Sequence, residues 1–260
     1  DSPACVPALH GLWWLRFTRG QLPAARVAAA RLLARAADSG PPWAEAAGYA
    51  AVGMTLAMQG ELDEARLHLA AAIDCQGDDD GPSSFVHDPG VAAASYLSVV
   101  LWWRGEPTAA RAQAAAAVAR AEALRHPLSQ MLALNMAAAM HHFAGEPGVA
   151  LELIERLYAV VEQHDLPRGP GSFSWLHGRA LVEAGEVARG LAEIDAAEQH
   201  CRRTGLLIGL SACALHRAEA CARAGRDDEA LAAAGAGIAW AAASGEHAFL
   251  APLHLVMAAQ

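Results

Sequence analysis

The chain has 260 residues, of which 54% are hydrophobic and 18% are charged, and its formal net charge is -9 at pH 7. This composition supports a sizeable core and excludes an intrinsically disordered chain, while the acidic balance disfavours direct contact with nucleic-acid phosphates. All 19 basic residues are arginine, which excludes chemistry that depends on lysine, such as a P-loop or a Schiff base.

Helices are the predicted elements throughout, because alanine, the strongest helix former, supplies about a quarter of the sequence. The predicted first helices of successive pairs span 6–18, 43–58, 90–103, 127–143, 171–183, 206–223 and 247–259. The predicted second helices span 22–37, 62–75, 107–124, 147–164, 187–203 and 227–243. Every apolar run of 18 residues is interrupted by Gly, Arg or His, so no transmembrane helix is predicted.

A glycine recurs between the two helices of each pair, at separations of 40, 45, 40, 40 and 40 residues. The six positions are Gly20, Gly60, Gly105, Gly145, Gly185 and Gly225. Glycine there closes one helix in the left-handed conformation, and the small residue five positions later allows the second helix to approach closely. The repeat predicts an all-α, right-handed α-solenoid of about six helical hairpins plus a closing helix, forming one domain over residues 1–260.

The irregular interval of 45 residues predicts one long loop, over residues 77–90, between the second and third repeats. Asp78, Asp79 and Asp80 resist helix packing there, and a solvated loop is a simpler explanation for them than a calcium site. Asp88 followed by Pro89 predicts a helix N-cap with proline in the first turn. His87 beside Asp88 is the best single candidate for a metal ligand, although anchoring of the loop is the preferred role.

The spacing of the turn glycine and the small residue resembles the tetratricopeptide repeat (TPR), with about six extra residues per unit. More specifically, the series from His87-Asp88-Pro89-Gly90-Val91 through Gly105-Glu106-Pro107 is similar to the C-terminal helical-repeat region of one group of bacterial regulators. That group combines an AAA/STAND-type ATPase with a class III adenylate/guanylate cyclase or a LuxR-type DNA-binding domain. The resemblance runs from about residue 9 to the C-terminus, and it implies a cytoplasmic regulator whose ATPase and output domains lie upstream of Asp1.

The resemblance also implies a concave groove lined by the first helix of each pair. Residues that lie 10, 6, 3 and 2 positions before each turn glycine are expected there. They are His10, Trp14, Phe17, Met54, Met58, Ser95, Trp102, Trp103, Asn135, His142, Phe143, Trp175, Arg179, Glu183, Glu219 and Arg223. The groove is thus aromatic and Met-rich in its N-terminal two-thirds and charged in its last third, which suits a peptide or a small molecule. The alternative is that these aromatic side chains pack against neighbouring helices or an upstream domain.

Other functional patterns are weak. His141 and His142 are adjacent, so on a helix they point about 100° apart and do not readily chelate one ion. Arg179/Glu183 and Glu219/Arg223 are spaced as surface ion pairs, and in the groove they could hold a charged partner group. No nucleophile, phosphate-binding or zinc-protease motif is present, so neither an enzyme nor a cofactor is predicted.

We therefore expect a non-catalytic sensor or protein-interaction domain that binds a peptide, a partner protein or a small effector in its groove. It would dock on the upstream ATPase of the same polypeptide and bind neither nucleic acid nor membrane. The alternative is a passive scaffold that self-associates as a homodimer through the apolar C-terminal stretch of residues 249–257.

Overall fold

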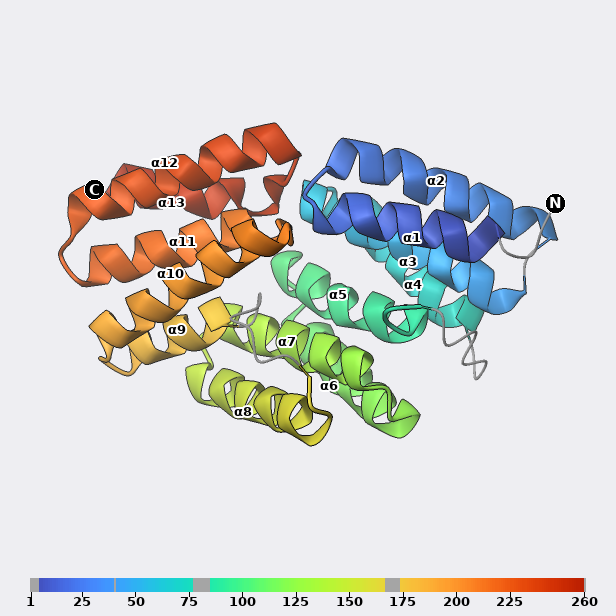
Figure 1. Cartoon of the computed structure of the whole chain (residues 1–260), viewed down its shortest axis with the longest axis horizontal. Helices are drawn as coiled ribbons and strands as arrows, with labels where there is room; N and C mark the ends of the chain where they lie inside the picture. Colours follow the sequence, from blue (N-terminus) through green and yellow to red (C-terminus); the bar gives the residue numbers. More distant parts are fainter. Residues whose placement is uncertain (1–4, 40, 77–84, 167–173, 260) are drawn as a thin grey trace. The chain divides into compact units, whose positions relative to one another are not determined.

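The computed structural model describes residues 5–39, 41–76, 85–166 and 174–259, and within these ranges it contains helices and turns but no strand (Figure 1). The first helices of the pairs are α1 (Cys5–Thr18), α3 (Pro42–Gln59), α5 (Pro89–Trp103), α7 (Pro127–Phe143), α9 (Ser174–Glu183) and α11 (Leu210–Arg223). The second helices are α2 (Leu22–Ser39), α4 (Leu62–Gln76), α6 (Pro107–Leu124), α8 (Pro147–Gln163), α10 (Val187–Thr204) and α12 (Asp227–Ser244). A 3₁₀ turn (His247–Phe249) leads into the closing helix α13 (Leu250–Ala259).

The chain divides into two compact units. Unit 1 comprises Asp1–Phe17 and Leu22–Leu166, and unit 2 comprises Thr18–Gln21 and Pro167–Gln260. Unit 1 therefore holds nearly all of α1 to α8, and unit 2 holds α9 to α13.

The turns between paired helices confirm the predicted role of the repeating glycine. All six glycines have positive φ, from 65° at Gly20 to 90° at Gly185, a conformation that costs glycine no steric penalty. Pro107 and Pro147 lie in the first turn of α6 and α8, where a missing N–H costs no helical hydrogen bond. The repeat in the sequence is therefore a repeat of turn geometry.

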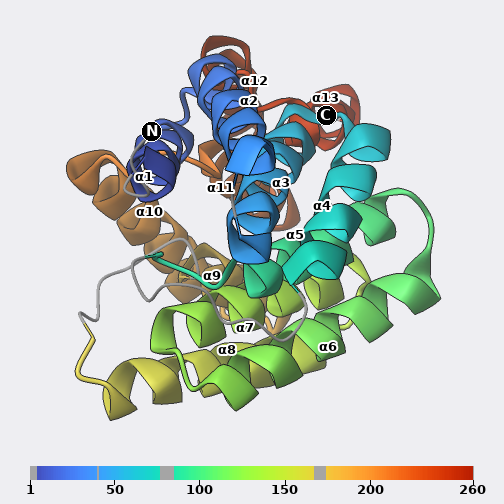
Figure 2. The same cartoon turned by 90° about the vertical axis from the view of Figure 1, so that its right-hand side faces the viewer.

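Small residues bring paired helices into close contact, as expected. A Cβ atom added to Gly178 of α9 would lie 2.6 Å from the carbonyl oxygen of Gly190 in α10, so the two backbones touch. A Cβ added to Gly53 of α3 would meet Leu69 of α4 at the same distance. Figure 2 shows α7 and α8 side by side as one such hairpin.

The first helices form the inner wall of each unit. In unit 1, α3 contacts α5 and α5 contacts α7, and in unit 2, α9 contacts α11 and α11 contacts α13. Among the described residues, the second helices contact mainly the helices before and after them in the chain. Because a stack that keeps only one row of helices in mutual contact curves toward that row, α3, α5 and α7 line the inner wall of unit 1, and α9, α11 and α13 line that of unit 2.

A ladder of arginine–glutamate ion pairs ties successive hairpins of unit 1 together. Each pair joins the residue six after one turn glycine to the residue that directly follows the next turn glycine. The ladder consists of Arg26–Glu61, Arg66–Glu106 at 3.8 Å and Arg111–Glu146 at 2.6 Å. These side chains are between 31% and 45% exposed, so solvent screens each pair and its contribution to stability is small, yet all three pairs recur at equivalent places.

The predicted helix boundaries agree with the structure to within two residues, except at two helices near the C-terminus and at residues 171–173, which lie outside the described residues. The prediction of a helix over 206–223 is wrong at its start, because Gly209 has φ 86° and α11 begins only at Leu210. The predicted helix 247–259 opens with the 3₁₀ turn, so α13 itself begins at Leu250.

Candidate functional site

Four of the predicted groove residues in unit 1 belong to its core. Phe17, Met54 and Ser95 are each 1% exposed and Met58 is 7% exposed. The Ser95 hydroxyl donates a hydrogen bond to the Val91 carbonyl oxygen one turn earlier, at 2.6 Å. None of these four side chains presents a surface to a ligand in this structure.

The N-terminal aromatic residues pack against the segment that precedes α5. The ring of His10 lies 4.4 Å from that of Phe85, and the ring of Trp14 lies 5.2 Å from that of His87. Trp13, which was not among the predicted groove residues, is 2% exposed and donates its indole N–H to the Thr55 hydroxyl at 3.0 Å. The cavity left among them measures about 10 Å³, enough for at most one water molecule, so this cluster is a packed one.

Burial keeps the histidines of this cluster neutral. It lowers the pKa of both His10 and His87 from 6.5 to about 4. For His87, a hydrogen bond from Nδ1 to the Leu128 carbonyl oxygen, at 3.0 Å, partly opposes that effect. At neutral pH both rings therefore serve as uncharged packing groups.

Asp88 anchors the loop, as the sequence predicts. Its Oδ1 atom accepts a hydrogen bond from the Val91 backbone N–H at 2.8 Å, which caps α5. Gln76 donates to Oδ2, and the Asp88 backbone N–H donates to the Ser129 hydroxyl at 2.9 Å, so the cap joins α4, α5 and α7. Residues 78–80, with the three aspartates, lie outside the described residues.

The half-buried part of the unit 1 inner wall lies on α5 and α7. We define the unit 1 wall cluster as Trp103, Asn135, His142 and Phe143, all of intermediate exposure. The ring of Phe143 lies 5.7 Å from both Trp103 and His142. The Oδ1 atom of Asn135 is buried without a hydrogen-bond partner in the described part of the chain. A polar atom in that condition is costly unless a ligand or water supplies a donor.

Trp102 lies beside this cluster but engages a different helix. The guanidinium carbon of Arg111, on α6, lies 5.5 Å from the centroid of the Trp102 ring, which is a cation–π arrangement. Adjacent residues on a helix point about 100° apart, so Trp102 and Trp103 serve different neighbours. Of the two tryptophans, Trp103 faces the next inner-wall helix.

The inner wall of unit 2 is charged. We define the unit 2 wall cluster as Trp175, Arg179, Glu183, His216 and Glu219, from α9 and α11. Arg179 is 6% exposed, and it donates to Glu183 at 3.1 Å and to Glu219 at 2.5 Å. Trp175 stacks on His216 with ring centroids 4.7 Å apart, and burial lowers the pKa of His216, so the ring is neutral. The unit 2 wall cluster thus combines a buried arginine that pairs with two acids and a stacked pair of rings from the same two helices.

One of the two predicted ion pairs forms with its expected partner. Arg179 pairs with Glu183 along α9, as the spacing predicts. Glu219 instead reaches Arg179 across to α9, while Arg223 lies exposed at the end of α11. The contact between inner-wall helices overrides the local spacing because the buried guanidinium needs the second carboxylate.

A buried carboxyl group in unit 2 had no signal in the sequence. Glu246, just after α12, is 0% exposed and accepts a hydrogen bond from the Trp240 indole N–H at 3.1 Å. Burial raises its pKa from 4.5 to about 7, although hydrogen bonds to the charged form oppose the shift. Nothing distinguishes this residue in sequence from an ordinary glutamate in a turn.

Sequence reasoning also missed a pocket of about 200 Å³ on the second-helix side of unit 2, which we call the outer pocket. It lies among α10, α11 and α12, and its walls combine charged groups with alanines and one indole. The residues that define it are Glu198, Arg202, Arg217, Glu229, Ala233 and Trp240. The charged members carry no motif, and the alanines resemble the many others in the chain.

The described residues contain neither a metal-binding cluster nor a helix that could span a membrane. Within them, no group of three or more His, Cys, Asp and Glu side chains is arranged to hold a metal ion. None of the described helices combines the length and apolar character needed to span a bilayer.

Comparison with known proteins supports the fold. No protein-family model and no curated protein sequence matches the chain. Among solved structures, Rap protein complexed with competence and sporulation factor is similar with a TM-score of 0.65 and 9% identity, over 96% of this chain and 74% of that one. The APC/C hetero-tetramer Cut9-Hcn1 is similar with a TM-score of 0.56 and 14% identity, over 92% of this chain and 47% of that one. The prediction of an all-α solenoid of TPR-like helical hairpins is therefore confirmed.

Proposed function

We propose that residues 1–260 act as one non-catalytic sensor or protein-interaction domain, which binds a peptide, a partner protein or a small effector on its inner wall. The observation that carries the proposal is the unit 1 wall cluster, which combines aromatic rings of intermediate exposure with the Oδ1 atom of Asn135, buried without a hydrogen-bond partner in the described part of the chain. A partner that supplies an N–H or O–H there would satisfy an otherwise costly polar atom.

The solved neighbours support a binding role. The Rap protein structure holds competence and sporulation factor, and Cut9 is assembled with Hcn1, so proteins with this helical-repeat fold occur with partners in both cases. A curved row of helices offers side chains from several repeats to one partner. We carry that mode of binding over to this chain.

The two wall clusters would contribute different chemistry. Trp103 and Phe143 offer aromatic surface to an apolar anchor, and His142 and Asn135 offer polar groups beside it. In unit 2, the buried Arg179 holds the side chains of Glu183 and Glu219 in place. A charged group of a partner would therefore meet preorganised carboxylates. Among the predicted groove residues, we assign six to contact with a partner: Trp103, Asn135, His142, Phe143, Glu183 and Glu219.

The wider setting follows the family resemblance. We propose that this domain belongs to a cytoplasmic bacterial signalling or transcription regulator, and that it relays binding to an upstream ATPase of the same polypeptide. Binding would shift the solenoid between two docked arrangements.

The experiment is selection from a library of short random peptides, with the wild-type chain as bait. We expect enriched peptides to lose at least about tenfold in affinity for the Trp103→Ala/Asn135→Ala variant, since a hot-spot aromatic and a hydrogen bond are removed together. Leu67→Ala, on the exposed face of α4, is the matched control. Enriched peptides that bind the double variant as well as wild type would refute the inner-wall assignment.

Self-association is a second candidate that one observation favours. Leu255 is 69% exposed and Met257 is 41% exposed on α13, so the closing helix leaves apolar surface uncovered. Sedimentation of the Leu255→Ser/Met257→Ser variant tests it: a dimer that becomes a monomer supports a scaffold role, and an unchanged mass rejects it.

A further inference from the structure

The outer pocket has an apolar floor and one fixed aromatic wall. Leu210 and Ala233 are 5% and 8% exposed at its base, and Ala236 lines it from α12. The Trp240 ring at one end is held in place by its hydrogen bond to the buried Glu246, at 3.1 Å. A preorganised apolar surface of this kind suits a hydrocarbon or aromatic group, because no side chain must be ordered to receive it.

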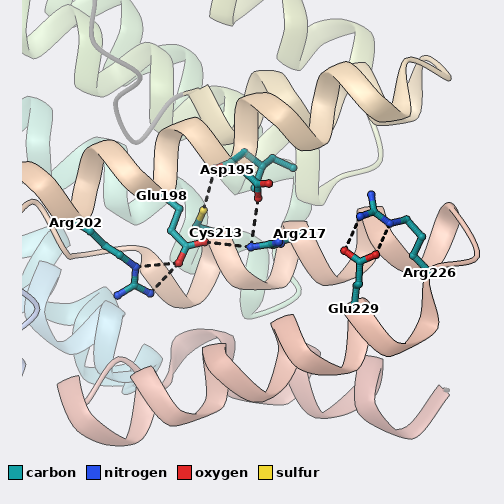
Figure 3. Close-up of polar contacts among 8 residues, drawn as sticks. Asp195, Glu198, Arg202, Cys213, Arg217, Arg226 and Glu229 are labelled. Carbon is teal, nitrogen blue, oxygen red and sulfur yellow. Dashed lines mark hydrogen bonds and ion pairs between the residues drawn. The ribbon is translucent and has the colours of Figure 1, made fainter.

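Two of the acids around the pocket are already bound by arginines. Arg202 donates twice to Glu198, at 2.8 and 3.0 Å, and Arg226 donates twice to Glu229, at 2.5 and 2.7 Å (Figure 3). These two pairs are neutral as units and supply little net attraction to a ligand.

Arg217 differs from both of these arginines. Its Nη1 atom lies 3.3 Å from Asp195 Oδ1 and 3.8 Å from Glu198 Oε2. Neither contact is a hydrogen bond, and Asp195 Oδ1 is buried without a hydrogen-bond partner in the described part of the chain. Among the described residues, Arg217 is thus the pocket arginine whose N–H groups form no hydrogen bond with a carboxylate. Its side chain is 36% exposed, so solvent reaches it.

We propose that the outer pocket binds a carboxylate attached to an apolar or aromatic body. The carboxylate would pair with the guanidinium of Arg217, whose planar array of donors matches two carboxylate oxygens. The body would lie on the alanine floor beside Trp240. This site is on the second-helix side of unit 2 and does not depend on the inner-wall function proposed above.

The size of the pocket limits the ligand. At about 200 Å³ it lies below the range of drug-sized sites, so it accommodates a small acid or a single terminal residue of a peptide. A free aryl or alkyl carboxylic acid and a peptide C-terminus share this chemistry. Asp195 already contacts the guanidinium of Arg217, so the carboxylate of the ligand must displace the Asp195 carboxylate.

The probes are 3-phenylpropionate and its uncharged analogue 3-phenylpropanamide, with a short peptide ending in phenylalanine, as the free acid and as the amide. Binding is followed by NMR through the indole N–H of Trp240 in the ¹⁵N-labelled full chain. We expect the acid to bind with a Kd in the millimolar range or tighter, as its few atoms allow, and the amide at least about tenfold more weakly.

Three variants separate the parts of the site. Arg217→Met keeps an apolar stem but removes the donors, and should weaken acid binding at least about tenfold. Asp195→Asn removes the competing charge and should tighten it. Ala236→Leu fills the pocket from an exposed helix position and should abolish binding, whereas Ala242→Leu, also exposed on α12 but outside the pocket, should leave it unchanged.

The binding results decide whether the outer pocket recognises a carboxylate. Binding of the small acid, or of the free-acid peptide alone, supports it and identifies which source of the carboxylate fits. Equal binding of acid and amide, binding that survives Arg217→Met and Ala236→Leu, or no shift of the Trp240 signal with either acid at about 10 mM, above the expected Kd, overturns it.

Discussion

The two compact units share one repeat and one turn geometry, yet they bury different chemistry. Unit 1 fills its N-terminal half with aromatic rings and with two histidines that burial keeps neutral. Unit 2 buries an arginine between two acids, and a carboxyl group whose pKa is raised to about 7. Hairpin stacking is therefore satisfied by backbone and small residues, which leaves the inner side chains free to diverge.

The divergence gives the two units different responses to pH. In the folded state, His10 and His87 have pKa values of about 4, below the value of 6.5 expected in the unfolded chain. Their contribution to the free energy of unfolding is therefore present above pH 6.5 and is lost as the pH falls toward 4. Glu246 in unit 2 has a folded pKa above the unfolded 4.5, so its contribution is present below 4.5 and is lost as the pH rises through 7. Acid should loosen unit 1, and unit 2 as well because burial also lowers the pKa of His216, whereas alkali should loosen unit 2 through Glu246.

The largest expected effect is in the aromatic core of unit 1. Trp13→Ala should lower the free energy of unfolding by about 4 kcal/mol, because a fully buried indole leaves a cavity and the Thr55 hydroxyl loses its donor. Urea unfolding measures the loss, and hydrogen exchange should locate it in α1 to α5. A loss below about 1 kcal/mol, the size seen at exposed sites, would show that the cluster is not packed as described.

The next effect isolates the acid of unit 2. Glu246→Gln should raise the free energy of unfolding by up to about 3 kcal/mol at pH 8, since the neutral amide avoids burying a charge, with little change at pH 4. Hydrogen exchange of α11 and α12 amides at both pH values measures it. Equal effects at the two pH values would mean that Glu246 does not titrate between them.

A smaller effect tests the buried ion cluster. Arg179→Met should cost about 2 kcal/mol, because Glu183 and Glu219 lose their partner while solvent still reaches part of each side chain. Adding Glu219→Gln should recover about half of that loss, and the double-mutant cycle measures the coupling in thermal unfolding. Additive losses would place the two side chains outside one network.

Much of the fold could be predicted because the turn glycines report backbone geometry directly. A residue that must adopt positive φ is recognisable in one sequence, and six at nearly equal spacing fix the helix boundaries. The predicted helix start at residue 206 is wrong because two left-handed glycines, Gly205 and Gly209, precede α11. Asp88 could be predicted because a cap is a local interaction.

The candidate site was harder to predict, since burial on an inner wall depends on neighbouring hairpins. Counting back from the turn glycine assigns both Met54 and Trp103 to the groove, yet Met54 lies in the core and Trp103 is of intermediate exposure. The outer pocket draws Arg217, Ala233 and Trp240 from two helices with no shared spacing. The raised pKa of Glu246 depends on its burial in the folded chain, which no local pattern in the sequence indicates.

The ladder of ion pairs has a consequence for how such a chain can change its length. Arg66 and Arg111 occupy equivalent positions, so excising residues 66–110 would place Arg111 directly after Ala65, where it would meet the partner of the next step, Glu146. Inserting a copy of the same stretch would likewise match at both seams. Tandem duplication and loss of whole modules are thereby compatible with the surface chemistry. Leu151 occupies the position where the next arginine of the ladder would lie, so the ladder does not continue beyond Glu146. The matching of modules therefore stops at the last hairpin of unit 1.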